Sequence, residues 1–442
     1  MDMMEKIVNL CKRRGMIFSS SEIYGGLSSI YDYGHYGVLL KNNVKKMWWD
    51  ENVMTNEMII GIDSAVILHP KVWEASGHVS SFTDPLVECK SCHQRFRSDH
   101  LMEGKYGEVK TNDGKAKCPQ CFGELTEEKK FNLMFKTYIG PVEQSASFVY
   151  LRPETAQGIF IDYKTMQAAY SKKIPFGIAQ VGRAFRNEIT PGNFTFRMRE
   201  FEQMEIEFFV TPGSDEKWHQ YWLDKRMQWY LKLGIHKDHL RLRKHEKNEL
   251  SHYSKATYDI EYLFPWGWGE LEGIANRTDF DLTQHQKYSG RDMKYHDEAT
   301  KESYIPYVIE PSAGADRATL AFLIDSYKED GKRVILGLHP VLAPIKVAVF
   351  PLVANKEELT TFARQIYDNM KIHFPTIWDD RGNIGKRYYA QDEIGTPWCI
   401  TIDYQTLTDK TVTIRYRDTA KQIRLGQDQL ISYFQKELAN TI

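Results

Sequence analysis

Apolar residues recur at helical or alternating spacing along most of the chain, and this pattern predicts a mixed α/β protein. The segments with helical spacing are 2–14, 39–52, 213–233, 318–327, 356–371 and 427–438. The short apolar or alternating runs that predict strands are 58–68, 303–310, 347–350, 398–402 and 412–416. Gly15 follows a basic last turn and predicts the end of the first helix. Pro70 predicts the end of the strand at 58–68.

Changes in amino-acid composition along the chain indicate three structural units: a main domain, a module inserted into it and a C-terminal domain. Residues 86–130 hold clustered cysteines and many Lys and Gly residues, which indicates a small module inserted into a main domain of 1–85 and 131–340. Prolines and a new apolar strand mark a boundary near residue 345. The pattern after this boundary predicts alternating strands and helices. Residues 345–442 are therefore expected to form a compact α/β domain of about 100 residues.

Composition narrows the class of protein. The chain has 442 residues, of which 42% are hydrophobic and 26% charged, and this balance excludes disordered, collagenous and coiled-coil classes. The formal net charge is −1, so a nucleic acid would need a local basic surface. No run reaches about 18 apolar residues and the N-terminus lacks an apolar signal segment. We therefore expect a soluble, cytoplasmic protein with no membrane partner.

Four of the six cysteines form two C-x-x-C pairs, Cys89/Cys92 and Cys118/Cys121. In a long chain without an export signal, this spacing indicates metal binding rather than disulfides. Four thiolates suit a structural, tetrahedral Zn²⁺. The 25 residues between the pairs exceed the spacing of common zinc ribbons. A degenerate module with reduced thiols is the alternative.

The segment 180–209 predicts two antiparallel strands joined by a loop that contains Pro191-Gly192. Alternate side chains of a strand share a face. The residues predicted to share faces are Arg186 and Glu188 on the first strand and Arg199, Phe201, Gln203 and Glu205 on the second. A solvated face with salt bridges is one interpretation. The other is a floor that binds a phosphorylated ligand with an aromatic base.

Three further segments place carboxylates beside small residues: 310–317 (EPSAGADR), 151–157 (LRPETAQ) and 270–276 (ELEGIAN). We expect 310–317 to lie between a strand and a helix, with Arg317 in the first turn, where a helix N-terminus attracts anions. An ordinary turn, or structural ion pairs, would explain each segment alone.

Taken together, these segments resemble a known family. FRNE, a loop and RMREFEQMEIEFF are similar to motif 2 of class II aminoacyl-tRNA synthetases, EPSAGADR to motif 3, and 58–70 to motif 1. The segments LRPETAQGIF, ELEGIANRTD, GKRYYAQDEIGTPWCITID and TVTIRYRDT resemble the dimeric glycyl-tRNA synthetases. Neither class I signature, HIGH or KMSKS, is present.

The resemblance implies a fold and an activity. The fold would be an α+β catalytic domain on an antiparallel sheet, of residues 1–85 and 131–340. A zinc-ribbon-like insertion at 86–130 and a C-terminal α/β anticodon-binding domain at 345–442 would complete it. The activity would be a ligase that forms glycyl-adenylate from glycine and ATP with Mg²⁺, then transfers glycine to the 3′ end of tRNA(Gly). The partners would be glycine, tRNA(Gly) and a second copy of the chain, without DNA.

Site residues follow by resemblance. Those expected to act in catalysis are Arg186, Glu188 and Arg317. The residues expected around ATP are Arg186, Asn187, Glu188, Phe196, Arg197, Met198, Arg199, Glu200, Phe201, Glu270, Leu271, Gly314, Ala315, Asp316 and Arg317. Within this set, Arg186 would contact the α-phosphate, Arg317 the far end of the triphosphate and Phe201 the adenine ring. Glu270 would also bind Mg²⁺.

Glycine offers no side chain, so the resemblance places its ammonium group among the carboxylates of Glu154, Glu205 and Glu310. The residues expected around glycine are Arg97, Glu154, Phe201, Glu202, Gln203, Met204, Glu205, Glu310, Pro311, Ser312, Ala313 and Gly314. Three close carboxylates repel one another, so at least one should have a raised pKa. In the C-terminal domain, the side chains that could contact RNA are Lys386, Arg387, Tyr388, Tyr389, Arg415, Tyr416 and Arg417.

Two other functions stay open at this point. One is a class II synthetase for threonine, proline or histidine, against which the EPSAG segment and the three carboxylates argue. The other is a non-catalytic relative that binds nucleic acid. Such relatives usually lose the arginine of motif 2 or motif 3, whereas Arg186 and Arg317 are both present.

Overall fold

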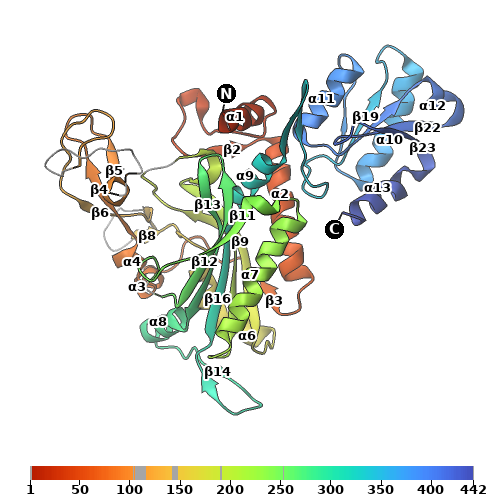
Figure 1. Ribbon diagram of the computed structural model, residues 1–442. Coiled ribbons are helices and arrows are strands. Elements are labelled where there is room, and N and C mark those ends of the chain that lie inside the picture. Colours follow the sequence, from red (N-terminus) through yellow and green to blue (C-terminus); the bar gives the residue numbers. More distant parts are fainter. Residues whose placement is uncertain are drawn as a thin grey trace.

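The computed structural model describes residues 2–102, 104, 116–141, 148–189, 192–251 and 253–441. A large sheet with helices on both faces occupies its centre, and a smaller sheet domain and a Cys-containing module flank it on opposite sides (Figure 1). Part of the predicted insertion, residues 103 and 105–115, lies outside the described residues. The chain is a sheet-rich α+β protein.

The central sheet has seven strands in the order β11-β12-β13-β16-β10-β9-β3 within the described residues. Their bounds are β11 Leu240–Lys244, β12 Ala256–Phe264, β13 Gly267–Thr278, β16 Tyr307–Gly314, β10 Glu200–Val210, β9 Phe176–Phe185 and β3 Ile59–Gly61. All pairs are antiparallel except β3 with β9. The predicted antiparallel pair within 180–209 is therefore confirmed as β9 and β10.

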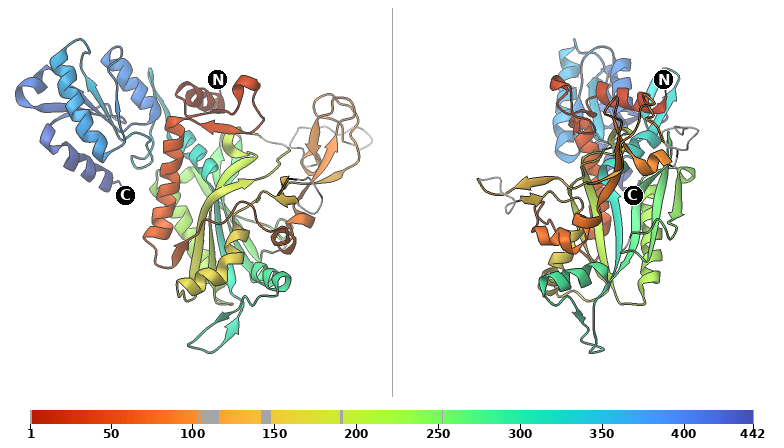
Figure 2. Two further views of the ribbon diagram at one scale, coloured as in Figure 1. Left: turned by 180° about the vertical axis from the view of Figure 1, so that it is seen from behind. Right: turned by 90° about the vertical axis from the view of Figure 1, so that its left-hand side faces the viewer.

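Alternation along β10 separates the two faces of this sheet. Met204, Ile206 and Phe208 join the core beneath the helices α2 (His35–Trp49), α7 (Asp215–Lys232) and α9 (Ala315–Ser326). Phe209, on the opposite face, packs with residues of α6 (Ala156–Ala169) and α8 (Phe280–Ser289). Figure 2 shows the long helices α2 and α7 running beside the sheet. Polar residues on the second face are consequently free to line a site.

A β-bulge in β13 keeps a further carboxylate on that second face. Ile260 of β12 pairs with Glu272 and Glu261 pairs with Glu270, so Leu271 is an extra residue without a partner in the register. Leu271 is buried in the core, and Glu272 forms an ion pair with Arg226 of α7 (2.7 Å). Because the bulge resets the alternation, Glu270 faces the same side as Gly273.

Several predicted elements are confirmed and others are wrong. The helices at 2–14, 213–233 and 356–371 are α1 (Met3–Arg13), α7 and α10 (Glu357–His373). The predicted strand 58–68 shortens to β3, because only three residues find a partner on β9. Pro70 does not end a strand. It begins helix α3 (Pro70–Ala75), where its missing N–H leaves no hydrogen bond unmade.

Two further expectations are corrected. Residues 310–314 do not form a connecting turn, because they belong to β16, and α9 starts directly at Ala315. The 14-residue helix α6 lies outside the segments with helical spacing, so the expected helices omit it. Helix α6 buries five consecutive residues at its start, 156–160, so it shows no apolar stripe.

The C-terminal part of the chain forms its own five-stranded sheet in the order β20-β19-β21-β22-β23. The strands are β20 Thr376–Trp378, β19 Val347–Pro351, β21 Trp398–Ile402, β22 Thr411–Tyr416 and β23 Gln422–Gly426. The helices are α10, α11 (Ile384–Ile394), α12 (Tyr404–Asp409) and α13 (Leu430–Ala439). Apolar residues of α10, α13 and the strands share a core separate from that of the central sheet.

The Cys-containing module is built on a three-stranded sheet, β5-β4-β6, of Arg95–Arg97, Thr83–Glu88 and Lys129–Asn132. The smaller pairs are β1–β2 (Ile17–Ser19, Tyr31–Tyr33), β7–β8 (Lys136–Tyr138, Phe148–Tyr150), β14–β15 (Tyr295–His296, Ser303–Tyr304) and β17–β18 (Tyr327–Asp330, Arg333–Leu336). The short helices are α4 (His78–Ser81) and α5 (Ser98–Met102). None of the helices in the described residues has the length and apolarity to cross a membrane.

Candidate active site

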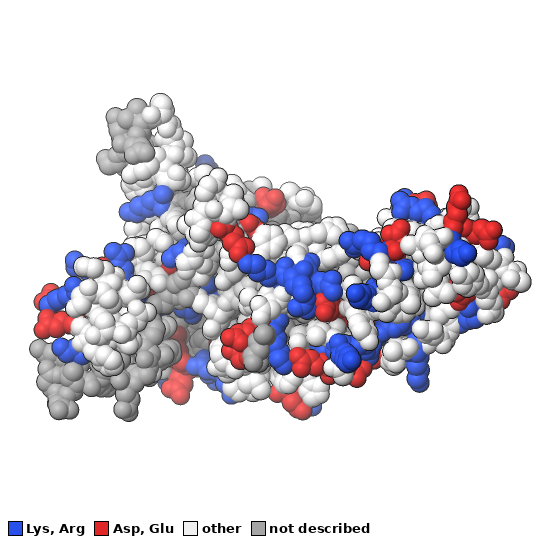
Figure 3. All heavy atoms as spheres, turned by 90° about the horizontal axis from the view of Figure 1, so that it is seen from above, with Lys and Arg blue, Asp and Glu red and all other residues white. Residues whose placement is uncertain are grey.

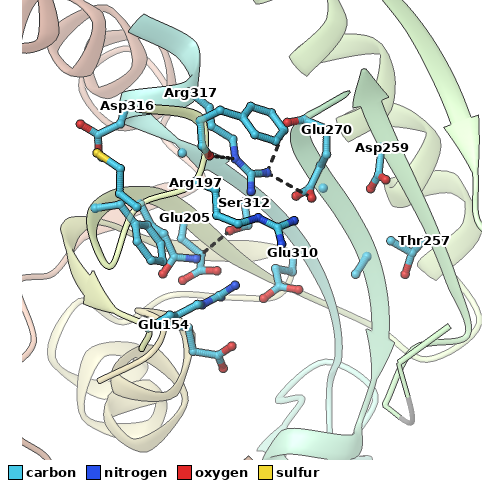
Figure 4. A pocket seen from close by; sticks show the side chains of 18 of the residues that line it. Glu154, Arg197, Glu205, Thr257, Asp259, Glu270, Glu310, Ser312, Asp316 and Arg317 are labelled. Atoms are coloured by element: carbon cyan, nitrogen blue, oxygen red, sulfur yellow. Dashed lines mark hydrogen bonds and ion pairs between the residues drawn. The ribbon is translucent and has the colours of Figure 1, made fainter. Parts of the chain in front are cut away.

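A cavity of about 260 Å³ opens on the second face of the central sheet, over β10, β13 and β16. Figure 4 shows its two ends: Glu154, Glu205 and Glu310 gather at one, and Arg317 with Glu270 lies at the other. Its lining residues are Glu154, Arg186, Glu188, Thr195, Phe196, Arg197, Met198, Phe201, Gln203, Glu205, His245, Ser251, Tyr253, Thr257, Asp259, Glu270, Gly273, Ala275, Glu310, Ser312, Gly314, Asp316 and Arg317.

Arg186 follows directly after β9, and in the described part of the chain aromatic rings and a carbonyl oxygen, not a carboxylate, hold its guanidinium. Its guanidinium lies 5.3 Å from the ring centre of Phe201 and 5.4 Å from that of Phe82. Its Nε donates to the carbonyl of Pro153 (2.9 Å). Stacking of this kind fixes the planar group while keeping its positive charge available to an anion.

Arg317 occupies the other end of the cavity at the start of α9. Its guanidinium packs 4.5 Å from the ring centre of Phe196, donates to the Phe196 carbonyl (3.0 Å) and forms an ion pair with Glu270 (3.1 Å). The Arg317 charge holds the pKa of Glu270 below its usual range. Burial and the nearby Glu270 raise the pKa of Asp259 to about 6. This end therefore presents ionised carboxylate and guanidinium groups side by side.

The opposite end is rich in buried carboxylates. Glu205 accepts a short hydrogen bond from the Thr155 hydroxyl, and Glu154 pairs with His78 (3.3 Å). Burial, together with the Glu154 charge, raises the pKa of Glu205. Burial also favours the neutral form of Glu154, but His78 and Arg277 outweigh it and hold its pKa well below the usual range. Glu154 thus remains an anion beside a carboxyl that tends to bind a proton.

Arg277 of β13 is the cation of this end, and sequence reasoning did not find it. It is 1% exposed, donates to Glu310 (2.8 Å) and grips Asp281 through two bonds of 2.7 and 2.8 Å. Burial nevertheless raises the pKa of Glu310 to about 8, although the charge of Arg277 offsets part of this rise. The expectation of at least one raised pKa among the carboxylates is thereby confirmed.

Many of the residues expected from the sequence do line the cavity. Those from the ATP set are Arg186, Glu188, Phe196, Arg197, Met198, Phe201, Glu270, Gly314, Asp316 and Arg317. Those from the glycine set are Glu154, Phe201, Gln203, Glu205, Glu310, Ser312 and Gly314. The cavity therefore brings together residues that lie up to 163 positions apart, from Glu154 to Arg317.

The expected residues that do not line it are Asn187, Arg199, Glu200, Leu271, Ala315, Arg97, Glu202, Met204, Pro311 and Ala313. Strand alternation explains most of them. Met204, Leu271 and Ala313 are buried in the core on the helix side of the sheet. Glu202, on that same side, binds Lys41 and Lys45 at 2.8 Å each. Glu200 pairs with Arg183 instead.

Arg97, Asn187 and Arg199 also lie elsewhere. Arg97 forms ion pairs with Asp84 (2.8 Å) and Asp99 (2.6 Å), which hold it within the Cys-containing module. Asn187 and Arg199 line a separate open hollow beside that module. These three residues therefore do not line the main cavity, contrary to the expectation from the sequence.

The lining residues that sequence reasoning missed are Thr195, His245, Ser251, Tyr253, Thr257, Asp259, Gly273 and Ala275. Most lie between residues 245 and 275, where the sequence predicted no strand although β12 and β13 form there. Alternation within ATYDIEYLF, of β12, was the signal that could have identified Thr257 and Asp259.

The four cysteines of the two C-x-x-C pairs converge. Their sulfur atoms all lie within 4.8 Å of one another, with Cys89 and Cys121 3.4 Å apart and Cys92 and Cys118 3.6 Å apart. Four thiolates around a tetrahedral zinc, at a Zn–S distance of about 2.3 Å, stand roughly 3.8 Å apart. The donor set and its spacing therefore fit this ion.

The two cysteine turns have matching backbones. His93 N–H donates to the Cys89 carbonyl and Phe122 N–H to the Cys118 carbonyl, both at 2.9 Å. His93 and Phe122 each have a φ of +57°, the left-handed conformation that lets such a turn close. Hydrogen bonds from the N–H groups of Cys92 and Ser91 contribute to lowering the pKa of Cys89 to about 6, which favours the thiolate.

Three of the four basic residues that could contact RNA in the C-terminal domain need correction. Arg387, Arg415 and Arg417 are buried. Arg387 donates to the Pro351 carbonyl and Arg415 binds Asp392 through both nitrogens at 2.8 and 2.9 Å. These side chains stabilise the domain and are not available to a ligand. Tyr389, by contrast, is 44% exposed.

The C-terminal domain has a recognisable sequence. Residues 346–437 match the family model described as the anticodon binding domain. A cavity lined by arginines and carboxylates on an antiparallel sheet, joined to such a domain, defines the chain as an aminoacyl-tRNA synthetase.

Curated relatives identify the family. The glycine–tRNA ligase of Thermobifida fusca is 55% identical over 454 aligned positions, which span 99% of this chain and 98% of the relative. The glycine–tRNA ligases of Treponema denticola and Geobacillus thermodenitrificans are each 52% identical, across 99% of this chain and 97% and 98% of their own lengths. The chain belongs to the glycine–tRNA ligase family.

Proposed function

We propose that the main cavity is where this family member joins glycine to ATP, before glycine passes to the 3′ end of tRNA(Gly). The observation that carries this proposal is the division of the cavity, with buried carboxylates at one end and Arg317 beside Glu270 at the other, while Arg186 also lines it. The carboxylate end suits an ammonium group, and the arginine end suits phosphates.

The chemistry asks for positioning rather than for a base. The glycine carboxylate is ionised at neutral pH and can attack the α-phosphorus directly, so pyrophosphate leaves with the bonding electrons. Arg186 and Arg317 would neutralise the charge that develops on the phosphate oxygens. Both guanidinium groups are already fixed against aromatic rings, at 5.3 and 4.5 Å from the ring centres of Phe201 and Phe196. Such preorganisation lowers the reorganisation needed in the transition state.

Magnesium is expected to accompany ATP, and the residues at the arginine end fit it. Glu270 is ionised through its contact with Arg317, so it can supply an oxygen ligand. A bound magnesium ion would neutralise part of the triphosphate charge.

Glycine would be recognised by its ammonium group and by the lack of a side chain. Glu154, Glu205 and Glu310 line one small end of the cavity with Gln203 and Ser312, whose side chains are hydrogen-bonded (3.3 Å). Larger amino acids would have to displace this bonded wall. Glycine has no smaller rival, so exclusion by size can be more complete than discrimination by a missing methylene.

Amino-acid-dependent ATP–pyrophosphate exchange tests this function. Glycine should support exchange, while alanine, threonine, proline and histidine should not. Glu205→Gln should raise the glycine KM at least tenfold with little change in the ATP KM, because it removes charge only at the ammonium end. Glu216→Gln, on the exposed surface of α7, is the matched control. Equal exchange with alanine, or an unchanged glycine KM in Glu205→Gln, would contradict the assignment.

The class II catalytic fold, with domain bounds 1–85 and 131–340, 86–130 and 345–442, belongs to this proposal. So does a structural zinc held by Cys89, Cys92, Cys118 and Cys121, for which the convergence of the four sulfur atoms is the support. Lys and Arg side chains gather in a band between the main domain and the C-terminal domain (Figure 3). Such a band suits the phosphate backbone of tRNA, although the net charge of the chain is only −1.

We also propose that two copies of the chain associate. Strand β3, within the segment similar to motif 1, is the edge strand of the central sheet in the described part of the chain, so a further strand could pair with it. The loop after β1 exposes Ile23, Tyr24 and Leu27, at 88%, 87% and 59%. Light scattering at micromolar concentration should give about twice the 51.6 kDa chain mass. A fully active monomer would rule the dimer out.

A further inference from the structure

Glu207 is a buried acid whose role the proposed reaction does not explain. It lies two residues after Glu205 on β10, so its side chain points to the same face of the sheet. It is 0% exposed, and among the described residues neither of its carboxylate oxygens has a hydrogen-bond partner. Glu207 does not line the cavity, and therefore lies behind the residues that do.

The carboxyl groups of Glu205, Glu207 and Glu310 form one cluster. An oxygen of each lies within 4.8 Å of an oxygen of both others, and all three residues are buried. Glu205 and Glu310 form part of the cavity wall, at the end where an ammonium group fits. Glu207 is thus in direct electrostatic contact with the ammonium subsite without touching its occupant.

The groups around Glu207 do not balance three negative charges. Arg277 binds the cluster directly through Glu310, and it already holds Asp281 through two further bonds. The other titratable groups of the surroundings are Glu154 with its partner His78, Tyr253 against Arg277, and His285, which bonds to Gln157 of α6. Burial lowers the pKa of His285 and favours its neutral form. Five carboxyl groups, those of the cluster with Glu154 and Asp281, therefore surround Arg277, and the charge of a second buried arginine, Arg152, acts on Glu205.

Such a cluster holds protons when its cavity contains no cation. Burial and the neighbouring Glu310 raise the pKa of Glu207 well above its ordinary value. Glu205 has the Thr155 hydroxyl and Glu310 has Arg277 to stabilise a negative charge. Glu207 has no comparable partner among the described residues, so it is the member of the cluster best suited to hold a proton.

We propose that glycine binding is an exchange of cations, in which the ammonium group of glycine replaces a proton held by Glu207. This inference rests on the proposed function of the cavity. The O–H bond of the Glu207 carboxyl breaks, its proton passes to solvent, and glycine keeps its own ammonium protons. The net charge of the occupied subsite then equals that of the empty one. Glu207 acts as a positioning residue that sets the charge of Glu205 and Glu310 without contacting the substrate.

Titration calorimetry of the full chain with glycine tests the exchange. Binding enthalpies are measured at pH 7.5 in two buffers of different ionisation enthalpy. The difference between them should correspond to about one proton taken up by the buffer for each glycine bound. The glycine Kd should correspondingly fall as the pH rises from 6 to 8, by up to about tenfold per pH unit for one released proton. Binding with no proton release, or a Kd that is constant over this range, would overturn the exchange.

Glu207→Gln separates Glu207 from its neighbours, since the amide has a similar shape and cannot release a proton. It should bind glycine with a release close to zero and a nearly flat pH profile, while Glu216→Gln should match the wild type. Proton release equal to that of the wild type would overturn the role of Glu207. If the variant fails to fold, the wild type still tests the exchange for the cluster of Glu205, Glu207 and Glu310 as a whole: proton release supports it, and no release overturns it. Absence of glycine binding by the wild type would instead refute the proposed function.

Discussion

At the scale of single residues, the alternation of side chains along β10 decides which of them reach the cavity. Phe201 and Glu205 face the cavity, as the alternation of a strand predicts. Glu202 and Met204 came from the motif as a continuous run, and alternation places them on the opposite face. Arg277 escaped notice because no local pattern indicates that its guanidinium reaches Glu310, 33 positions away. Such pairings depend on the register between β13 and β16.

Arg186 should supply charge in the transition state rather than affinity for the substrates. Arg186→Ala should lower the rate of glycine-dependent pyrophosphate exchange by about 100-fold or more, with smaller changes in KM. Arg186→Lys should recover little, because an ammonium cannot stack between Phe82 and Phe201. Arg183→Ala, an exposed arginine on β9 three residues before Arg186, is the matched control. A rate within threefold of the wild type in Arg186→Ala would contradict this role.

The raised pKa of Glu207 also predicts how stability depends on pH. The folded chain binds this proton more tightly than the unfolded chain, so the stability it provides falls as the pH rises above the ordinary carboxyl pKa. Between pH 6 and 8, Glu207→Gln should gain stability relative to the wild type, by up to about 1.4 kcal/mol per pH unit. Denaturant unfolding of the ligand-free proteins measures the difference. A difference that does not change with pH would show that Glu207 is already ionised.

At the scale of elements, the contrast between apolar and polar positions along the chain decided which helices and strands could be predicted from the sequence. Helices with one apolar face, such as α1 and α10, were predicted within two residues of their ends. Helix α6 was missed because its first turns are buried on all sides. Strands β11, β12 and β13 were missed because they carry charged residues. Two examples are Glu272, which pairs with Arg226, and Asp259, which lines the cavity. Polar side chains that a strand buries in pairs look like surface residues in a sequence.

The two cysteine turns should bind one zinc per chain, which metal analysis of protein purified without chelators would measure. Cys118→Ser should lose the zinc and destabilise the β4–β5–β6 module, since the ion ties Cys89 after β4 to a distant turn. Cys11→Ser should keep it. Cys11 is a lone buried thiol whose pKa burial raises to about 12, so it serves as the matched control. Four freely titratable thiols in metal-free, folded protein would argue against the site.

At the scale of the whole molecule, the chain separates the proposed chemical site from the anticodon-binding domain. The sequence predicted that domain, because its strands and helices alternate in order. The junction could not be predicted, since it joins residues such as Arg14 and Glu393 that are 379 positions apart. Helix α11 reaches the main domain with its C-terminal end, where Asp392 accepts a bond from Arg333 of β18 (3.3 Å). This helix therefore spans from the C-terminal sheet to the main domain.

The segment between the two parts is also fixed by a lysine. Lys346 is buried, and its ammonium group donates to the carbonyl oxygens of Pro340, Val341 and Ala343, each at 2.8 Å. Three acceptors match the three N–H bonds of a charged ammonium group. The turn before β19 is consequently held in one conformation, which favours a fixed orientation of the C-terminal domain.

A fixed orientation matters only for a substrate that touches both parts, and tRNA is that substrate in the proposed function. At the junction, Glu393 of α11 binds Arg14 (2.5 Å) and Arg13 (3.1 Å) at the end of α1. Glu393→Arg would place three arginines together and repel the two parts. We expect tRNA aminoacylation to fall about tenfold, while glycine-dependent pyrophosphate exchange, which needs the main cavity alone, stays unchanged.

A variant in which the charges of Glu393, Arg13 and Arg14 are swapped provides the decisive comparison with Glu393→Arg. Combining Glu393→Arg with Arg13→Glu and Arg14→Glu restores opposite charges with reversed sign, so aminoacylation should recover toward the wild-type rate. Glu357→Gln, at the exposed start of α10 and away from the junction, should leave both reactions unchanged. If Glu393→Arg slowed both reactions equally, the junction would support the stability of the main domain rather than the alignment of tRNA. A partial recovery confined to aminoacylation would show that the contact between α1 and α11 sets the distance between anticodon and active site.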